Sequence, residues 1–362
     1  MKKIIGILLA GALVTSAFAV DFTARVNTKI TAAGGTLGEN PSVYLLQANN
    51  TDQKDADLLE VHFAGDKAGA DFKLFTKAAD SAVSMRGLGL WFKPIDMLKF
   101  NVGYVNYGTF CEHTDWWKAV SGVGVNALSG WSNFATVDGF GAMVTLNPIA
   151  GLEFNAGVTP GADGKFIEIA GESFKSTAWG ASVKADLNAF AEIPVVAAVS
   201  FRDAGKDKEK ILAVGASYGQ EYSGNFYGFI NARMRFESSK FVAVALDNWF
   251  KFTFDALGIQ LAVPVTLRLT GDVNDPSWMG ARLKVTYNMG AATPYVYAES
   301  TALRFDDKLV DNFGMCVRPG VTFNVGVCAI DAGVQFDINK AWDFEYSKGI
   351  NWSVPVTFAV AF

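Results

Sequence analysis

Residues 259–270 read IQLAVPVTLRLT, and this stretch decides the class of the fold. Large apolar side chains stand at every second position from Ile259 to Leu269, and Gln260, Thr266 and Arg268 stand between them. A period of two is typical of a β-strand, because successive side chains of a strand point to opposite faces. The stretch therefore predicts a strand with one apolar face and one polar face.

The same alternation recurs along the chain, in residues 22–32, 71–78, 98–104, 179–187, 226–236 and 279–288. Its apolar positions are large over runs of about ten residues, as a bilayer requires, and the opposite positions are often charged. A soluble β-sandwich also alternates, but its packed core could not hold unpaired charges. The pattern therefore favours an all-β fold, an antiparallel transmembrane β-barrel with a polar interior.

Short and long connections alternate between the predicted strands. Short turns are expected at 65–69, 94–97, 147–151, 255–258 and 288–292, and long connections at 34–57, 108–137, 203–210, 306–312 and 339–349. This arrangement is typical of barrels with short periplasmic turns and long extracellular loops. Three ambiguous segments, 41–48, 295–305 and 321–338, leave a range of about 14 to 18 strands. We expect roughly 16, which is an even number, as single-chain bacterial barrels require.

The composition agrees with a membrane protein. Of the 362 residues, 50% are hydrophobic and only 19% are charged, which excludes a disordered chain. The formal net charge of −5 and the lack of a basic run argue against binding of nucleic acid. The three cysteines are too few for a disulfide scaffold and lack metal-ligand spacing, so we expect no metal and no cofactor.

The first 19 residues have the features of a secretory signal peptide. Lys2 and Lys3 precede an apolar segment at 4–14, and Ala17 and Ala19 form a small-residue cleavage pattern. We expect cleavage after Ala19, which leaves residues 20–362 as a single transmembrane β-barrel domain. An uncleaved anchor helix is the alternative, but the apolar segment is short for a span of about 20 residues.

The last predicted strand, residues 350–362, carries a resemblance to a known family. Apolar side chains alternate from Ile350 to the terminal Phe362. Together with the signal peptide, this strand resembles bacterial outer-membrane β-barrel proteins of the general-porin type, whose final strand ends on an aromatic residue read by the barrel-insertion machinery. The resemblance implies an assembly signal formed by Trp352, Phe358, Val360 and Phe362. A glycine often found in that signal is absent here, where Thr357 stands.

The same resemblance implies a location in the bacterial outer membrane, after export through the secretory pathway. The partners it implies are outer-membrane lipids, the barrel-insertion machinery and small solutes; it allows a homotrimer, and nucleic acid is not expected. The implied function is a porin for passive diffusion of small hydrophilic solutes and ions. Two alternatives stay open: a substrate-selective channel for a sugar or a hydrophobic compound, and a surface-exposed adhesin or structural barrel.

Inward positions of the predicted strands are more often basic than acidic. The basic residues expected on the pore wall are Arg25, Lys29, Arg233, Arg235, Arg268, Arg282 and Lys284. If the strands that carry the last five are neighbours, these charges form one basic patch. Charged rings inside a channel set its ion preference, so the patch predicts a weak preference for anions.

The long connection at 108–137 is a candidate constriction of the pore. It contains the acidic and aromatic residues Glu112, His113, Asp115, Trp116 and Trp117. In general porins the third long loop folds into the barrel and narrows it, and this connection is similar in length and position. The alternative is an outward surface loop whose tryptophans contact the membrane edge or another subunit.

We expect the protein not to be an enzyme. Residues 215–219 read GASYG and match the G-x-S-x-G pattern of hydrolases, which requires a sharp strand-to-helix turn and partnered His and Asp residues. Here the pattern lies in an alternating segment, and His62 and His113 are the only histidines in the sequence.

The terminal residue gives a first prediction. Deleting Phe362, or the substitution Phe362→Asp, should reduce insertion of the barrel while export continues, because the aromatic end of the last strand is the expected recognition signal. Pulse labelling followed by membrane fractionation measures the inserted fraction. Assembly at the normal level and rate would show that the terminal strand carries no such signal.

Overall fold

The computed structural model describes most of the chain after the first 20 residues, namely residues 21–38, 41–48, 58–77, 82–109, 133–159, 178–203, 209–218, 225–237, 239–269, 277–300, 303–304, 314–339, 341–342, 345–346 and 349–361. The expected signal peptide, residues 1–19, lies outside this part of the chain.

One antiparallel sheet contains 23 strands in the part of the chain that the structure describes. They are β1 (Asp21–Leu37), β2 (Ser42–Ala48), β3 (Leu58–Ala64), β4 (Ala68–Lys77), β5 (Ala82–Ile95), β6 (Leu98–Thr109), β7 (Asn133–Ile149), β8 (Leu152–Thr159), β9 (Ala178–Asp186), β10 (Val195–Asp203), β11 (Glu209–Tyr218), β12 (Phe226–Glu237), β13 (Lys240–Phe254), β14 (Leu257–Ala262), β15 (Val265–Arg268), β16 (Trp278–Met279), β17 (Arg282–Tyr287), β18 (Ala292–Ser300), β19 (Leu303–Arg304), β20 (Met315–Val325), β21 (Cys328–Gly333), β22 (Gln335–Ile338) and β25 (Ile350–Ala361). A separate pair, β23 (Ala341–Trp342) and β24 (Glu345–Tyr346), and the short helix α3 (Asn188–Ala191) are also described.

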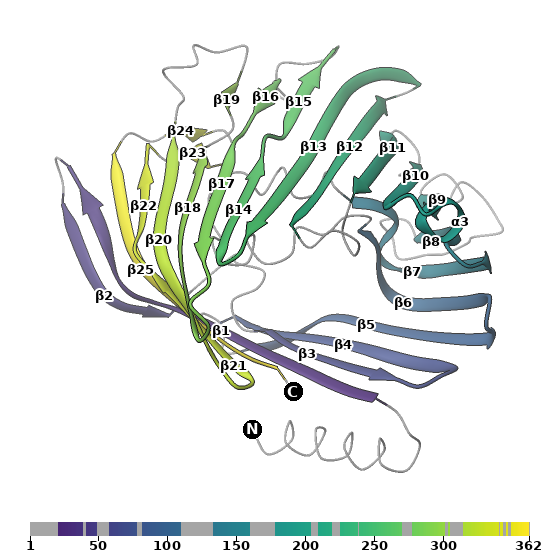
Figure 1. The fold of residues 1–362 in the computed structure, drawn as a ribbon, viewed down its shortest axis with the longest axis horizontal. Helices are drawn as coiled ribbons and strands as arrows, with labels where there is room; N and C mark the ends of the chain where they lie inside the picture. Colours follow the sequence, from purple (N-terminus) through teal and green to yellow (C-terminus); the bar gives the residue numbers. More distant parts are fainter. Residues whose placement is uncertain are drawn as a thin grey trace.

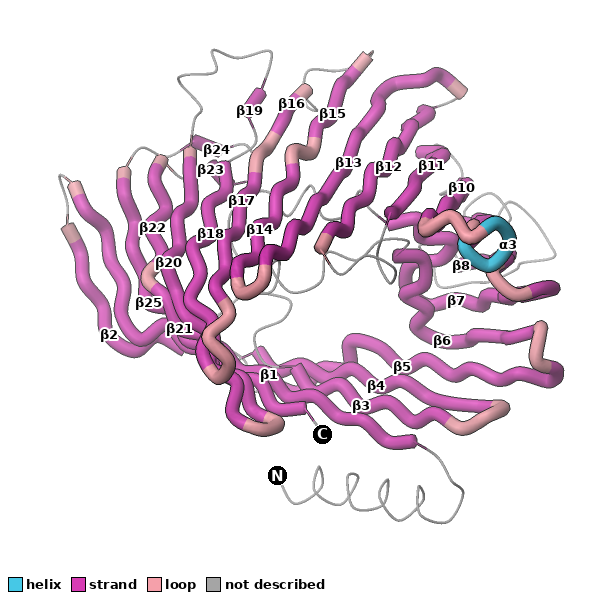
Figure 2. Tube along the Cα trace, viewed as in Figure 1, coloured by secondary structure: helices cyan, strands magenta, loops and turns pink. Residues whose placement is uncertain are grey.

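The sheet closes into a barrel because its first and last strands pair with each other. β1 and β25 run antiparallel, from the pair Arg25–Ala361 to the pair Leu37–Ile350. The strands between them pair with their neighbours in chain order, as β6 does with β7 and β12 with β13. Figures 1 and 2 show the strands curving around an interior. The prediction of an all-β antiparallel barrel is therefore confirmed.

Five passes of the chain across the barrel wall are interrupted. β2 and β3 pair one after the other with β1. The pairs β14/β15, β16/β17, β18/β19 and β21/β22 likewise continue each other against a common neighbour. The barrel therefore has 18 strands. This number is slightly above the roughly 16 that we expect from the sequence, because the ambiguous segment 41–48 belongs to the wall as β2 and the segment 321–338 contributes to two passes.

The five predicted short turns lie at one end of the barrel, which we call the turn end, because each of them follows a pass that runs in the same direction. All five predicted short turns are present, for example Asp96–Met97 between β5 and β6 and Asp255–Ala256 between β13 and β14. The connection between β9 and β10 is longer and contains α3. The longer predicted connections belong to the opposite end, the loop end.

The predicted long connection 34–57 is wrong in its first part. Gly34 and Gly35 belong to β1, and residues 42–48 return beside them as β2. These glycines allow close packing instead of a turn. A Cβ atom at Gly34 would collide with the Tyr44 ring, and one at Gly35 would collide with the backbone of Ser42.

The outer face of the barrel is apolar, and its parity matches the alternation in residues 259–270. Leu261, Leu267 and Leu269 are 38%, 39% and 50% exposed, whereas Ala262 between them is 1% exposed. The same parity holds on β12, where Ile230 is exposed and Phe229 is buried. The stretch is nevertheless divided into β14 and β15, with Val263 and Pro264 between them.

A side-chain amide bridges this division. Proline has no N–H to give to a neighbouring strand, so Pro264 interrupts the ladder. Asn248 of β13 donates its Nδ2 to the carbonyl of Val263 at 2.7 Å and accepts the Val263 N–H on Oδ1 at 2.8 Å. The amide thus satisfies both backbone groups of Val263.

No helix in the described residues is both long and apolar enough to cross a membrane.

The amide bridge gives a second prediction. Asn248→Ala should destabilise the barrel by about 1–3 kcal/mol for each backbone group of Val263 that loses its partner on the apolar outer face. Thermal unfolding followed by the gel mobility of the folded barrel measures this loss. Asn324→Ala, at the exposed turn end, is the matched control and should unfold like the wild type. Equal stability of the two variants would mean that the amide is dispensable.

Candidate functional site

The inner wall of the barrel carries the polar side chains. Strand register places Arg282, Glu299 and Cys316 in one row across β17, β18 and β20. The neighbours of these residues along the strands, such as Leu283 and Val296, are exposed on the outer face. The inner wall therefore brings charged side chains of neighbouring strands close together, and it is the candidate functional site.

One part of this wall, over β17 to β20, contains a buried ion pair. Arg282 Nε lies 2.9 Å and Arg282 Nη2 lies 2.8 Å from Glu299 Oε1, and both side chains are at most 3% exposed. The Tyr297 hydroxyl donates a hydrogen bond to the other carboxylate oxygen of Glu299. The Glu299 carboxylate therefore neutralises the charge of Arg282 within the wall.

A second buried ion pair lies beside the first. Arg318 of β20 is fully buried and donates from Nη2 to Asp331 of β21. The hydroxyls of Tyr295 and Thr322 donate to the same carboxylate at 3.0 and 2.9 Å. The Tyr295 ring packs over Gly320, where a Cβ atom would collide with it. Asp331 thus joins three strands of the wall.

Aromatic side chains extend this buried region toward β12. Phe229, Trp249, Tyr295 and Tyr297 face inward and are at most 4% exposed. The rings of Phe229 and Trp249 lie 6.1 Å apart, and Tyr227 meets Trp249 edge-on at 5.1 Å. Inward side chains of a wide open channel would contact water. These rings therefore pack against one another on this side of the inner wall.

The inner face of β3 to β9 is different, because several of its charged groups remain accessible to water, although Thr145 and Asn155 are buried. His62 and Asp71 lie 2.6 Å apart and are 40% and 46% exposed. Lys184 and Glu153 lie 3.5 Å apart, and the lysine is 43% exposed. Charged side chains on this side of the wall are therefore in contact with water.

The expected basic patch is not one patch. Arg235 and Arg268 both lie opposite Ala243, in a row near the loop end. Arg282 lies opposite Ala262, which is six residues from Arg268 on the same pass, or about 20 Å at 3.3 Å per residue. Lys284 lies still closer to the turn end. Arg233 lies opposite Ala245, two residues from Arg235, so the register places three of the five residues near the loop end and separates Arg282 and Lys284 from them.

The other predicted site residues fall in different parts of the chain. Arg25 and Lys29 belong to β1 on the parity of the inner wall, opposite Ala361 and Thr357. Trp352, Phe358 and Val360 lie on β25, and Phe358 is exposed on the outer face. Five loop residues and the terminal residue lie outside the described residues: Glu112, His113, Asp115, Trp116, Trp117 and Phe362.

The strand positions of the G-x-S-x-G match and of two cysteines show how these two sequence features are placed. Ser217 of the G-x-S-x-G match lies within β11 and is buried, so the pattern forms no strand-to-helix turn. Cys316 lies opposite Asp337, whereas Cys328 lies opposite Val325 at the turn end of the same two passes. The two cysteines therefore do not lie opposite each other, and both are free.

Sequence reasoning missed the acidic and aromatic members of the buried region, Glu299, Asp331, Tyr295 and Tyr297. They lie in the segments 295–305 and 321–338, where the strands are ambiguous in the sequence. The signal that could have found them is the alternation of Tyr295, Tyr297 and Glu299 with smaller residues, which continues the period of two.

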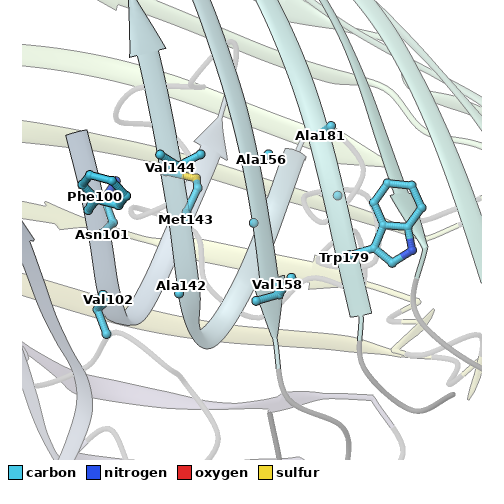
Figure 3. A pocket seen from close by; sticks show the side chains of 12 residues that line it. Phe100, Asn101, Val102, Ala142, Met143, Val144, Ala156, Val158, Trp179 and Ala181 are labelled. Carbon is cyan, nitrogen blue, oxygen red and sulfur yellow. The ribbon is translucent and has the colours of Figure 1, made fainter. Parts of the chain in front are cut away.

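A shallow groove of about 430 Å³ lies on the outer face of β6 to β9 (Figure 3). Its floor includes Ala142, Ala156 and Ala181, and Val102 and Trp179 border it. Val102 and Trp179 are exposed on the apolar outer face. A groove of this character offers no groups for a hydrophilic solute, so it is not part of the candidate site.

Comparison with solved structures finds the same fold in bacterial outer-membrane proteins. The chain superposes on Pseudomonas aeruginosa OccK10 (OpdN) with a TM-score of 0.60 at 8% identity, covering 95% of this chain and 99% of that one. OccK11 (OpdR) from the same organism gives 0.57 at 8% identity, covering 95% and 96%. The P. aeruginosa outer membrane protein OpdK gives 0.55 at 7% identity, covering 94% and 99%. The chain has the fold of a bacterial outer-membrane β-barrel.

The similarity is structural and extends over the whole length of these neighbours. No family model matches the sequence. No curated protein matches it either. The fold agrees with the expected transmembrane β-barrel architecture.

The buried pair Arg282–Glu299 gives a third prediction. Arg282→Met should destabilise the barrel by about 3–5 kcal/mol, because it leaves the Glu299 carboxylate buried without its cation. The double variant Arg282→Met/Glu299→Leu should recover most of this loss. Lys184→Met, which removes a water-accessible pair, should cost about 1 kcal/mol or less. Urea unfolding measures all three, and equal losses for Arg282→Met and Lys184→Met would contradict the assignment.

Proposed function

We propose that the protein is an outer-membrane channel for a restricted set of small hydrophilic solutes and not an enzyme. The observation that carries the proposal is the closed 18-stranded barrel whose outer face is apolar and whose inner wall holds water-accessible charges. Barrels of 16 to 18 strands enclose an aqueous channel. In this proposal residues 20–362 form the mature barrel after removal of the signal peptide.

The filled side of the interior favours a selective channel over a wide general porin. The buried region over β12 to β21 reduces the cross-section and leaves the water-accessible path against β3 to β9. A solute on that path meets charged and hydrogen-bonding side chains at close range, such as His62, Asp71 and Lys184. This favours the substrate-selective alternative, for a polar solute and not for a hydrophobic compound.

The ion preference that we propose is a weak preference for anions. Arg282 and Arg318 are each neutralised by a carboxylate, so they add little to the field along the path. The remaining inward cations include Arg25, Lys99 and Lys184, and acids such as Asp71 and Glu153 partly offset them. Whether the connection 108–137 narrows the path, and whether the barrel forms a trimer, remain predictions from the sequence.

Conductance and solute uptake test this function and give the fourth prediction. The purified protein in planar bilayers should produce discrete conductance steps, with a reversal potential in a salt gradient shifted slightly toward anions. The shift should fade at high salt, since screening acts over about 10 Å at 0.1 M. In liposome swelling, a selective channel should admit only some solutes of equal size.

Two results would contradict the proposal. Absence of conductance from folded protein would remove the channel function and leave the adhesin or structural barrel. Equal swelling rates for all solutes below a size limit would favour a general diffusion porin over a selective channel. Protein unfolded by heat before reconstitution is the control for contaminating channel activity.

A further inference from the structure

Two lysines share one indole ring on the inner wall near the turn end. The Nζ atoms of Lys93 and Lys99 lie 5.4 and 4.8 Å from the centroid of the Trp91 ring. The neighbouring residues Leu90 and Phe92 are exposed on the outer face, so Trp91 and Lys93 have the inward parity. Lys99 lies opposite Thr145, a buried inner-wall residue.

The strands bring the two positive charges together. Phe92 of β5 lies opposite Phe100 of β6, and Lys93 and Lys99 are the next residues on the two strands toward the turn. The register shifts beyond this pair, so the two lysines are not direct partners, but two like charges held near each other still repel. The Trp91 ring is fixed in place because it packs over Gly69, where a Cβ atom would collide with it. Its π face compensates only part of the repulsion.

Neither lysine forms an ion pair with a carboxylate of a described residue. The carboxylates of Asp71 and Glu153 lie within electrostatic range of Lys99. Each, however, is bound by another group. Asp71 is bound to His62 at 2.6 Å, and Glu153 lies 3.5 Å from Lys184 and accepts from Asn155 at 3.0 Å.

The acid at the adjacent turn is also occupied. Lys67 forms an ion pair with Asp96 across the two neighbouring turns. This hydrogen bond and the positive charge of Lys67 lower the pKa of the Asp96 carboxyl, so Asp96 is held as an anion by a different lysine. The charge of Lys93 and Lys99 is therefore left without a bound counterion among these acids.

A third donor lies beside the lysines. Asn101 is opposite Trp91 on β6, two residues from Lys99, and therefore shares its face of the strand. Its Nδ2 is buried and has no hydrogen-bond acceptor in the described wall. A buried donor without an acceptor costs free energy, about 1–3 kcal/mol. The amide therefore has an unused donor on the same face of the wall as Lys99.

We propose that Lys93, Lys99 and Asn101 form a binding site for a doubly charged oxyanion, of the phosphate or sulfate type, at the turn end of the channel. Two ammonium groups match two negative charges, and the amide N–H gives a further hydrogen bond to an oxyanion oxygen. Trp91 positions both lysines and keeps one side of the site apolar. The role of this site in solute passage rests on the proposed channel function. Binding of the oxyanion itself does not require transport.

Direct binding tests the site independently of conductance. Sulfate and inorganic phosphate are titrated calorimetrically into the folded protein in detergent, against chloride and acetate at equal ionic strength. The doubly charged anions should bind in a saturable way and at least about tenfold more tightly than acetate, because loss of one charge-assisted hydrogen bond weakens binding by about that factor. In bilayers, sulfate should reduce the chloride current with the same concentration dependence.

Single substitutions test whether sulfate binds at these residues. Lys93→Gln and Lys99→Gln should each weaken sulfate binding by about tenfold, and Asn101→Leu should weaken it by a smaller factor. Lys251→Gln is the matched control, since Lys251 is a lysine at the same end of the barrel on the opposite side of the interior, opposite Tyr227. It should leave sulfate binding unchanged. Each variant is accepted only if its thermal unfolding matches the wild type, and Lys99→Arg should retain binding.

The outcomes separate this proposal from the function on which it rests. Conductance without sulfate binding would overturn the oxyanion site and leave the channel intact. Sulfate binding that is weakened equally by Lys93→Gln and Lys251→Gln would overturn the site by showing a general effect of charge. Sulfate binding that depends on Lys93 and Lys99, in a protein that does not conduct, would support the site and overturn the channel.

Discussion

The pairing of β1 with β25 is the interaction on which the rest of the structure depends. An apolar outer face in a membrane provides no water for unpaired N–H and C=O groups, so each must find a partner within the barrel. Closure provides these partners for the first and last strands. Where the ladder is broken, neighbouring side chains take over. Asn248 bonds both backbone groups of Val263, and the Ser300 hydroxyl accepts the N–H of Ala281 at 2.8 Å.

Closure also determines how the interior is built. Inward glycines leave room on the wall, and aromatic rings from the neighbouring strand lie over them, as Trp91 does at Gly69 and Tyr295 at Gly320. The rings then hold cations in place. Lys284 lies 5.1 Å from the centroid of Tyr295, and the two lysines of the turn end lie over Trp91. Packing against glycine thus gives long basic side chains fixed positions in a wet interior.

The two sides of the interior have different physical roles. On the side of β12 to β21, ion pairs and aromatic rings are buried, so the charges of the ion pairs are compensated locally. On the side of β3 to β9, charges stay in contact with water. A net count of basic residues on the wall would therefore overestimate the field, because Arg282 and Arg318 belong to the first group.

The sequence by itself determined the strand class, the two faces and most of the turns. These are local properties: a period of two fixes which face a side chain takes, as Leu261 and Ala262 show, and short turns are fixed by the few residues that form them. The sequence also narrowed the number of strands to a range, but the short segment 41–48 could be assigned to the wall only through its pairing with β1. Only the tertiary structure decided which charges meet. Arg268 and Arg282 are separated along the wall, Arg282 finds Glu299, and Lys93 and Lys99 meet on Trp91, because register between strands sets these distances and each strand's own alternation contains no information about its alignment with the next.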